Sequence, residues 1–277
     1  MTLAPLIELN DGHFIPQLGL GTWPLDDDQA ATAVVQALEA GYRHIDTAVK
    51  YGNERGVGNG IRAGGVDRGE LFITTKLDGQ FQGEEKAAEG LEGSLRRLGL
   101  DYVDLLLIHW PLPARDDYVS TWRTFERLQS EGKVRSIGVS NFKPAHLERL
   151  MAETDVVPAV NQIQLSPAIT RSAEREFHRE HGIVTESYSP LGGSGADLLS
   201  APILTQLGEK HGKTPGQLVL RWHIQQGLVT IPKTANPDRM SENMDVFDFT
   251  LDPQDLAELA ILDDGPGAGN DSDVTGH

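Results

Sequence analysis

Short apolar segments alternate with longer amphipathic segments along the whole chain. Most of the short segments are β-branched or aliphatic throughout, a pattern typical of strands that are buried on both faces of a parallel sheet. They occupy residues 17–22, 43–48, 71–76, 102–110, 135–142, 159–165, 183–190 and 228–234. A hairpin is predicted before them at residues 6–16, with its turn at Asn10-Asp11-Gly12.

The amphipathic segments carry apolar residues at helical spacing. The clearest stripes are Ala33, Val34, Ala37 and Leu38; Ala87, Leu91, Leu95 and Leu98; Tyr118, Trp122 and Phe125; and Leu147, Leu150 and Met151. Two more helices are predicted from their start signals, because Thr214-Pro215 and Asp252-Pro253 each place a capping residue before a proline.

Eight strands joined by helical crossovers favour a closed parallel barrel over a doubly wound open sheet, because no break in composition divides the chain. We therefore predict an α/β protein, a (β/α)8 TIM barrel with an N-terminal β-hairpin and two extra helices. Residues 1–277 form one domain in this prediction. The acidic, glycine-rich residues 263–277 are expected to form a C-terminal loop or tail near the substrate cleft.

The charge balance narrows the classes of partner. The chain has 277 residues, with 24 Lys and Arg against 41 Asp and Glu, which gives a net charge of −17. Such a surface repels phosphate backbones and anionic lipids, so neither nucleic acid nor a membrane is the expected partner. No apolar run approaches the roughly 18 residues of a membrane span, and no signal segment is recognisable, so we expect a cytoplasmic protein.

The chain contains no cysteine, which excludes disulfides, Cys-ligated zinc and thiol nucleophiles. His178 and His181 are spaced as a pair of metal ligands would be, but they lie on a strongly polar helix. A solvated helix face is the expected reading, and no metal site is predicted. The glycines of residues 58–63 fit a dinucleotide-binding pattern but do not follow a strand, so this pattern is rejected.

Polar residues stand at the carboxyl ends of three consecutive predicted strands. The second strand ends at Asp46, the third at Lys76 and the fourth at His109, and Tyr51 follows Asp46 across a short loop. In a barrel these ends meet at one mouth, where active sites form. Neighbouring strands lie about 4.8 Å apart, so Asp46 and Lys76 can pair and His109 lies within roughly 10 Å.

These four groups suit proton delivery to a carbonyl that receives a hydride. The Lys76 ammonium is expected to lower the pKa of the Tyr51 phenol, and Asp46 would hold the ammonium in place. An imidazole beside them can orient the carbonyl oxygen. The alternative is a structural ion pair with Tyr51 and His109 packed nearby, which four mutually useful groups at consecutive strand ends disfavour.

Several segments in order resemble the signatures of the aldo/keto reductase family: IDTAVKYGNE, FITTKL, DLLLIHWP, RSIGVSNF, VNQIQ and IPKT followed by PDRMSEN. The chain is similar to the bacterial branch near the 2,5-diketo-D-gluconate reductases. The resemblance implies NADPH-dependent reduction of aldehydes or ketones, such as small dicarbonyls or keto-sugar acids, to alcohols. It implies Tyr51 as general acid, Lys76 and Asp46 as the groups that tune it, and His109 as the group that orients the substrate.

The resemblance also implies contacts with NADPH or NADP+. The implied cofactor residues are Gly21, Thr22, Ser140, Asn141, Gln162, Tyr188, Leu191, Ser194, Lys233, Thr234, Arg239, Glu242 and Asn243. Among these, Lys233 and Arg239 have a rationale of their own in so acidic a chain, because a phosphate monoester is bound best by arginine with lysine as a point charge.

Other expectations concern the substrate and the assembly. Trp23 and Trp110 follow strand ends and are expected to line an apolar substrate pocket. Lys50 precedes Tyr51 and is read either as a solvated side chain or as a group that favours anionic substrates. The resemblance implies a monomer. A non-catalytic NADPH-binding or sensor module of the same fold is the alternative function, which the intact set of four residues disfavours. A carbon–carbon double-bond reductase is disfavoured by His109.

Overall fold

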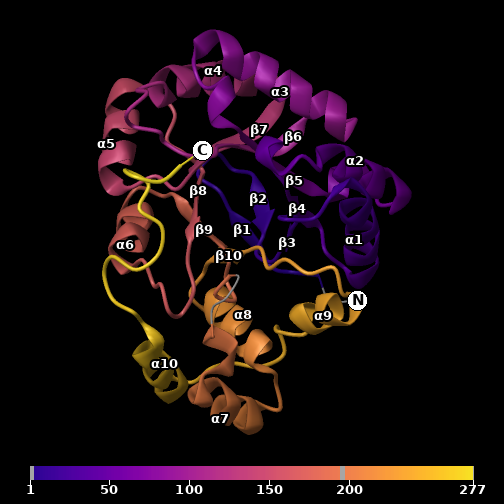
Figure 1. The fold of residues 1–277 in the computed structure, drawn as a ribbon, viewed down its shortest axis with the longest axis vertical. Coiled ribbons are helices and arrows are strands. Elements are labelled where there is room, and N and C mark those ends of the chain that lie inside the picture. The colour runs from indigo at the N-terminus through magenta and orange to yellow at the C-terminus, as the bar shows by residue number, and fades with distance from the viewer. Residues whose placement is uncertain (1–2, 194–196, 277) are drawn as a thin grey trace.

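In the computed structural model, which describes residues 3–193 and 197–276, eight parallel strands form one curved sheet surrounded by helices (Figure 1). The strands follow one another in chain order around the sheet. They are β3 (Leu20–Gly21), β4 (His44–Asp46), β5 (Phe72–Leu77), β6 (Val103–Ile108), β7 (Val134–Ser140), β8 (Val160–Gln164), β9 (Val184–Tyr188) and β10 (Val229–Thr230).

The first and last strands meet and close the barrel. Leu18 and Thr230 form a parallel bridge, and the Gly19 N–H donates to the Thr230 carbonyl at 2.9 Å. The Gly21 N–H donates to the Pro232 carbonyl at 3.2 Å. The predicted barrel is therefore confirmed, and all eight apolar segments form strands within it.

Helices lie outside the barrel and cover it (Figure 1). The helices between or after the strands are α1 (Asp27–Ala40), α2 (Glu54–Ala63), α3 (Glu84–Leu98), α4 (Tyr118–Ser130), α5 (Pro144–Glu153), α6 (Ser172–Glu180), α8 (Pro215–Gln225) and α9 (Pro237–Met244). The two extra helices are α7 (Pro202–His211) and α10 (Pro253–Leu259). The predicted caps are confirmed, since Thr214 accepts from the Gln217 N–H and Asp252 from the N–H groups of Gln254 and Asp255.

Helix α9 was not predicted. Its apolar positions are few, because Met240 and Met244 are its buried apolar residues. Its start is nonetheless well defined, since the Asn236 side chain accepts from the Asp238 N–H at 2.8 Å and Pro237 occupies the first turn. Caps rather than an apolar stripe define this short helix.

The glycine pattern of residues 58–63 lies inside helix α2 and not after a strand. Its position agrees with the expectation that it is not a dinucleotide-binding motif. A Cβ at Gly56 would lie 2.0 Å from the Asp27 carbonyl oxygen, and one at Gly58 would lie 2.0 Å from that of Leu98. These glycines let α2 approach α1 and α3 closely, so they serve helix packing.

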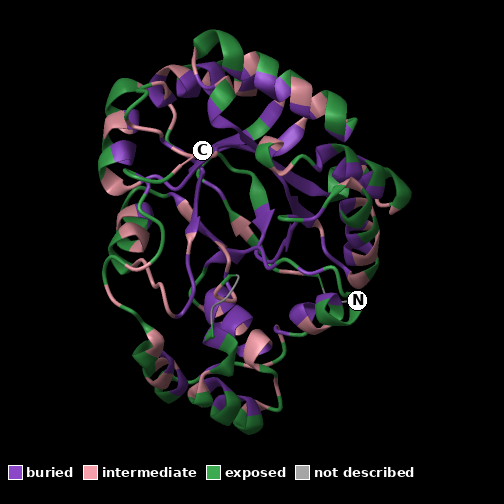
Figure 2. Cartoon of the chain, in the orientation of Figure 1, coloured by how far each residue is buried: buried purple, intermediate pink, exposed green. Residues whose placement is uncertain are grey.

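The hairpin of β1 (Leu6–Glu8) and β2 (Phe14–Pro16) closes the barrel at the amino ends of the strands. Ile15 is fully buried and shares an apolar cluster with Phe72 and Val229, which begin β5 and β10. Figure 2 shows the barrel strands mostly buried and the outer faces of the helices exposed. The closed floor leaves the carboxyl ends of the strands as the open mouth of the barrel.

One expectation about a helix face was wrong. His178 is fully buried rather than solvated, with Nδ1 2.8 Å from Thr185 Oγ1 and Nε2 2.8 Å from Asn161 Nδ2. Burial lowers the pKa of His178 to about 4. His181 is exposed, as expected. No cluster of three potential metal ligands occurs within the described ranges, and no helix there is long and apolar enough to cross a bilayer.

Candidate active site at the mouth of the barrel

The four residues predicted from strand ends converge at the barrel mouth. Asp46 is the last residue of β4, Lys76 lies near the end of β5, and His109 directly follows β6. Tyr51 ends a short 3-10 helix, Val49–Tyr51, which Gly52 terminates in the left-handed conformation with φ of 70°. This conformation is readily adopted by glycine, so Gly52 turns the chain immediately after the tyrosine.

Lys76 joins Asp46 to Tyr51. Its Nζ lies 2.5 Å from Asp46 Oδ1, 3.0 Å from the Thr47 carbonyl oxygen and 3.3 Å from Tyr51 Oη. Both Lys76 and Asp46 are buried, whereas Tyr51 is half-buried. The ammonium therefore uses its three donors on a carboxylate, a carbonyl and a phenol, and its position is fixed.

The electrostatic balance of Tyr51 differs from the sequence expectation. Burial raises the pKa of the Tyr51 phenol and outweighs the opposing effect of the Lys76 ammonium, so the net shift is upward rather than downward. Lys76 itself stays charged, because the Asp46 carboxylate raises its pKa against the effect of burial. The resting group therefore contains a neutral phenol beside a permanent cation.

Two aromatic rings frame the phenol. The Trp23 ring centroid lies 5.3 Å from that of Tyr51, and the His109 ring lies 5.8 Å away at an interplanar angle of 76°. Above them opens a cavity of about 970 Å³. Its lining includes Gly21, Thr22, Trp23, Lys50, Tyr51, His109, Trp110, Ser140, Asn141, Gln162, Tyr188, Leu191, Lys233 and Asn270. Most of the residues implied by the family resemblance thus face one space.

A network of amides forms one wall of the cavity. Asn141 follows β7 in the left-handed conformation (φ 64°), which asparagine tolerates, and its Nδ2 donates to the His109 carbonyl and to Ser140 Oγ, both at 3.0 Å. Tyr188 Oη donates to Asn141 Oδ1 at 2.9 Å. On the next strand, Gln162 Nε2 donates to Asp46 Oδ2 at 2.9 Å. The amide wall is therefore connected directly to the Lys76–Asp46 pair.

Two buried titratable residues, Glu186 and His44, lie below this wall, and sequence reasoning missed the first of them. Glu186 in β9 accepts from Gln162 Nε2 at 2.9 Å, and its other oxygen lies 3.6 Å from His44 Nε2. Burial, reinforced by the charge of Asp46, raises the pKa of Glu186 to about 8, and burial lowers the pKa of His44 to about 3. The sequence feature that could have revealed Glu186 is a carboxylate inside a predicted strand. It lies two residues before Tyr188 and therefore on the same face of that strand.

The residues implied to bind the 2′-phosphate follow β10 in the chain and extend into α9. Lys233 is exposed and lines the cavity, and Arg239 is exposed on α9. Neither side chain has a polar partner among residues 3–193 and 197–276, whereas most other cations of the chain are paired. Thr234 and Asn243 are buried beside them, and Glu242 accepts from Thr214 Oγ1 at 2.5 Å. These three and Arg239 do not line the cavity, and Ser194 lies outside the described residues.

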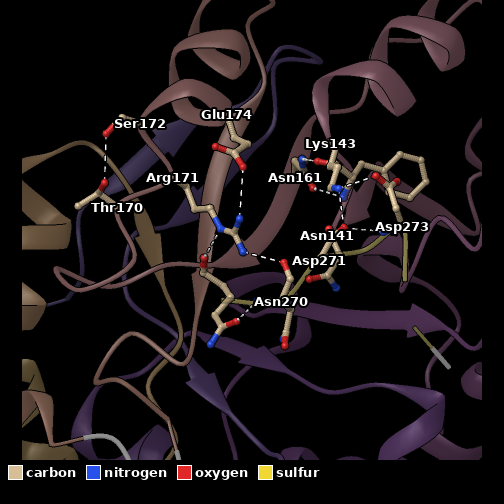
Figure 3. A network of polar contacts seen from close by, with 12 residues as sticks. Asn141, Lys143, Asn161, Thr170, Arg171, Ser172, Glu174, Asn270, Asp271 and Asp273 are labelled. Carbon is tan, nitrogen blue, oxygen red and sulfur yellow. Dashed lines mark hydrogen bonds and ion pairs between the residues drawn. The ribbon is translucent and has the colours of Figure 1, made fainter. Parts of the chain in front are cut away.

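The C-terminal tail is held across one side of the mouth (Figure 3). Lys143 Nζ lies 2.5 Å from carboxylate oxygens of both Asp271 and Asp273. Arg171 Nη2 donates to the Asn270 carbonyl at 2.8 Å, and Asn270 Nδ2 donates to Tyr188 Oη at 3.0 Å. The tail thereby reaches the same amide wall from outside.

The barrel and the polar group at its mouth have the form of an enzyme active site, and comparisons with known proteins agree. The profile described as "Aldo/keto reductase family" matches residues 17–264. An "Aldo-keto reductase" of Mycobacterium sp. is 48% identical over 97% of this chain and 96% of its own. "Methylglyoxal reductase DkgA" of Escherichia coli is 47% identical over the whole of both chains. The chain therefore belongs to the aldo/keto reductase family.

A solved structure extends this similarity to a bound cofactor. The structure of a Gox0644 variant in complex with NADPH aligns with the whole of both chains at a TM-score of 0.94 and 44% identity. The match covers every strand of the barrel and every described residue of the cavity.

Proposed function

We propose that this protein reduces small aldehydes and ketones to alcohols with NADPH, and that Tyr51 is the general acid. The observation that carries the proposal is the Tyr51–Lys76–Asp46 group, in which Oη lies 3.3 Å from a fixed ammonium on the floor of a large cavity. The family to which the chain belongs supports the same chemistry.

The residues present fit NADPH. Both N–H groups of the Asn141 amide and both of the Gln162 amide are already donated within the protein, so these side chains offer oxygen acceptors to the cavity. Asn141 Oδ1 also accepts from Tyr188 Oη and offers its second lone pair. Two such acceptors suit the primary amide of a nicotinamide, which has two N–H donors. At the other end, the cations Lys233 and Arg239, which have no polar partner among the described residues, suit the 2′-phosphate of the adenosine.

When bound, NADPH supplies the hydride for the carbonyl carbon. Tyr51 donates its phenolic proton to the carbonyl oxygen, and the alcohol forms. The phenolate that remains is stabilised by Lys76, whose charge Asp46 holds in place. The upward shift in the pKa of Tyr51 keeps the donor protonated before the reaction. His109 orients the carbonyl, and Trp23 and Trp110 line the cavity around it.

The substrate class follows from the same cavity and from one relative. A methylglyoxal reductase is 47% identical along the full chain, so we infer a small dicarbonyl or keto-sugar acid as substrate. Lys50 is exposed, lines the cavity and has no polar partner in the described part of the chain, which suits an anionic group on the substrate. This reading favours a role for Lys50 over a purely solvated side chain.

One copy of the chain, acting as a single domain in the cytoplasm, is the functional unit that we propose. Residues of this one chain supply the acid group and the described cavity lining, which supports this proposal. Activity that tracks a monomeric species in analytical ultracentrifugation supports this. Activity confined to a dimer fraction contradicts it.

The first test follows NADPH oxidation by purified protein against a panel of carbonyl compounds. The variant Tyr51→Phe removes the donated proton alone, so NADPH still binds while turnover falls by about 10²-fold or more. Wild-type protein that binds NADPH but reduces no compound, and whose Tyr51→Phe variant behaves identically, would instead indicate a cofactor-binding sensor.

A further inference from the structure

We infer that Glu186 is a positioning residue for the nicotinamide end of the cofactor, because together with Asp46 it fixes the Gln162 amide in one orientation. The inference rests on the proposed function, since it concerns how the site accepts NADPH. It adds a residue from the barrel interior that touches neither the substrate nor the reacting atoms.

Glu186 occupies an unusual place. Barrel interiors are filled mainly by bulky branched apolar side chains. Glu186 is the third residue of β9, is fully buried, and stands opposite Gln162 in the pairing of β8 with β9. A buried carboxyl group is costly unless its hydrogen bonds are satisfied, so its retention here calls for a partner that needs it.

That partner is the Gln162 amide. Its Nε2 carries two hydrogens, and they are donated to Asp46 Oδ2 and Glu186 Oε2, each at 2.9 Å. Rotating the amide by half a turn would bring Oε1 against the Asp46 carboxylate and would break both of these hydrogen bonds. The two carboxyl groups therefore leave Oε1 as the acceptor that Gln162 offers to a ligand in the cavity, which it lines.

The charges around Glu186 define its protonation. Lys76 is already paired with Asp46 at 2.5 Å, so an ionised Glu186 would be a second buried anion without its own cation. The remaining neighbour, His44, is neutral and bonded through Nε2 to Thr74 Oγ1 at 3.0 Å. Burial and the Asp46 charge keep Glu186 protonated at neutral pH. A neutral acid still accepts from Gln162 through its carbonyl oxygen, and so would a glutamine.

This equivalence supplies a matched pair of variants. Glu186→Gln keeps the acceptor and the shape, whereas Glu186→Leu keeps only the volume. Each variant is tested with two cofactors, NADPH and its reduced 3-acetylpyridine analogue. In the analogue a methyl ketone replaces the amide, so no N–H donor is left. Dissociation constants come from quenching of tryptophan fluorescence by each cofactor, so the readout does not depend on turnover.

We expect Glu186→Leu to weaken NADPH binding about tenfold, the loss of roughly one hydrogen bond, and to leave binding of the analogue unchanged. Glu186→Gln should bind both cofactors within about twofold of wild type, because the acceptor is kept. In a Gln162→Leu background, Glu186→Leu should have no additional effect, because the group that it positions is gone.

Equal weakening of both cofactors by Glu186→Leu, or none of either, would overturn the inference. If Glu186→Leu does not fold, Glu186→Ala is compared in the same way, with thermal unfolding as the check on integrity. Wild-type protein that fails to bind or oxidise NADPH overturns the proposed function itself. Wild type that binds and oxidises NADPH, with all Glu186 variants unchanged, overturns only the role of Glu186.

Discussion

Two lysine–aspartate contacts in this protein share the same groups and the same 2.5 Å separation but lie in opposite surroundings. Lys76 and Asp46 are 0% and 1% exposed at the base of the cavity. Lys143 and Asp271, which hold the tail, are 34% and 54% exposed. Distance alone therefore does not distinguish the two contacts, and solvent must account for any difference in what they do.

Solvent acts on the two contacts through desolvation and screening. Breaking a buried pair leaves an uncompensated charge in a medium of low dielectric constant, which costs roughly 3–5 kcal/mol. Water and salt screen an exposed pair, and ordering two long side chains offsets the attraction. The buried pair is thus a fixed part of the acid group, and the exposed pair is a reversible contact that holds a loop.

The buried pair gives the largest predicted effect. Lys76→Met should lower the free energy of unfolding by roughly 3–5 kcal/mol, because Asp46 is left buried without its cation. It should also reduce turnover at least about 10²-fold, since the phenolate at Tyr51 loses its stabilising cation. Urea unfolding and kcat for NADPH oxidation measure the two effects.

The double variant Asp46→Asn/Lys76→Met serves as the control. It removes both charges, so it should recover much of the stability and none of the turnover. A single Lys76→Met variant as stable as wild type would mean that the Lys76–Asp46 pair is solvated. The inferred difference between this pair and the exposed Lys143–Asp271 pair would then be wrong.

Glu186 extends the comparison to a buried carboxyl group without a cation of its own. Its pKa is about 8 in the folded protein against an ordinary value of 4.5, so between these pH values the folded state keeps a proton that the unfolded state has released. The wild type therefore loses stability as pH rises through this window, by at most about 1.4 kcal/mol per pH unit. Glu186→Gln has no such proton, so its stability relative to wild type should rise steadily from pH 5 to pH 8.

Urea unfolding of the two proteins at half-unit pH steps measures this difference. Asp46, Lys76 and His44 face Glu186 and are the same in both proteins, which makes the slope of the difference specific to position 186. A difference that is constant across the window would mean that Glu186 is ionised when folded.

The same contrast explains what the sequence predicted. Asp46, Lys76 and His109 stand where apolar strands stop, so each was visible as a local break in pattern, and barrel topology then brought them together. Glu186 lies inside a strand and its use depends on Gln162 from the neighbouring strand, which no local pattern reports. The polar helix around His178 likewise gave no sign that this one side chain turns toward Asn161.

Quantities that depend on the three-dimensional environment of a residue could not be predicted from the sequence either. The pairing of Lys76 with Tyr51 was expected, but the sign of the tyrosine pKa shift depends on how far burial outweighs that pairing. The contacts of the tail join residues 128 and 130 positions apart, and neither end has a local signature. Chemistry at strand ends was predictable, whereas the balance between burial and charge was not.

Lys233 and Arg239 represent a third case, exposed cations without a described protein partner. Replacing either with alanine should weaken NADPH binding about tenfold, the loss of a charge-assisted contact, and leave NADH binding unchanged. Fluorescence titration with both cofactors measures the ratio. Lys86→Ala is the matched control, because Lys86 is also exposed and without a described partner but lies on α3. Equal weakening of NADPH and NADH binding would show that Lys233 and Arg239 do not bind the 2′-phosphate.

The exposed contact of the tail gives the smallest effect, and salt is the means to detect it. Lys143→Ala should leave the unfolding transition unchanged, because solvent screens its pairs with Asp271 and Asp273. The loosened tail should raise KM for substrate a fewfold, since Asn270 lines the cavity and donates to Tyr188.

That increase should be largest near 0.01 M salt and should disappear toward 1 M, where the Debye length falls from about 30 Å to about 3 Å and the wild-type pair is screened as well. Arg127→Ala removes an exposed ion pair on α4 that lies apart from the cavity and should change neither KM nor its salt dependence. A KM for Lys143→Ala that differs from wild type equally at both salt concentrations would show that the lysine acts through packing of its aliphatic stem. The tail contact would then not be electrostatic, and it would differ from the Lys76–Asp46 pair in more than its exposure to solvent.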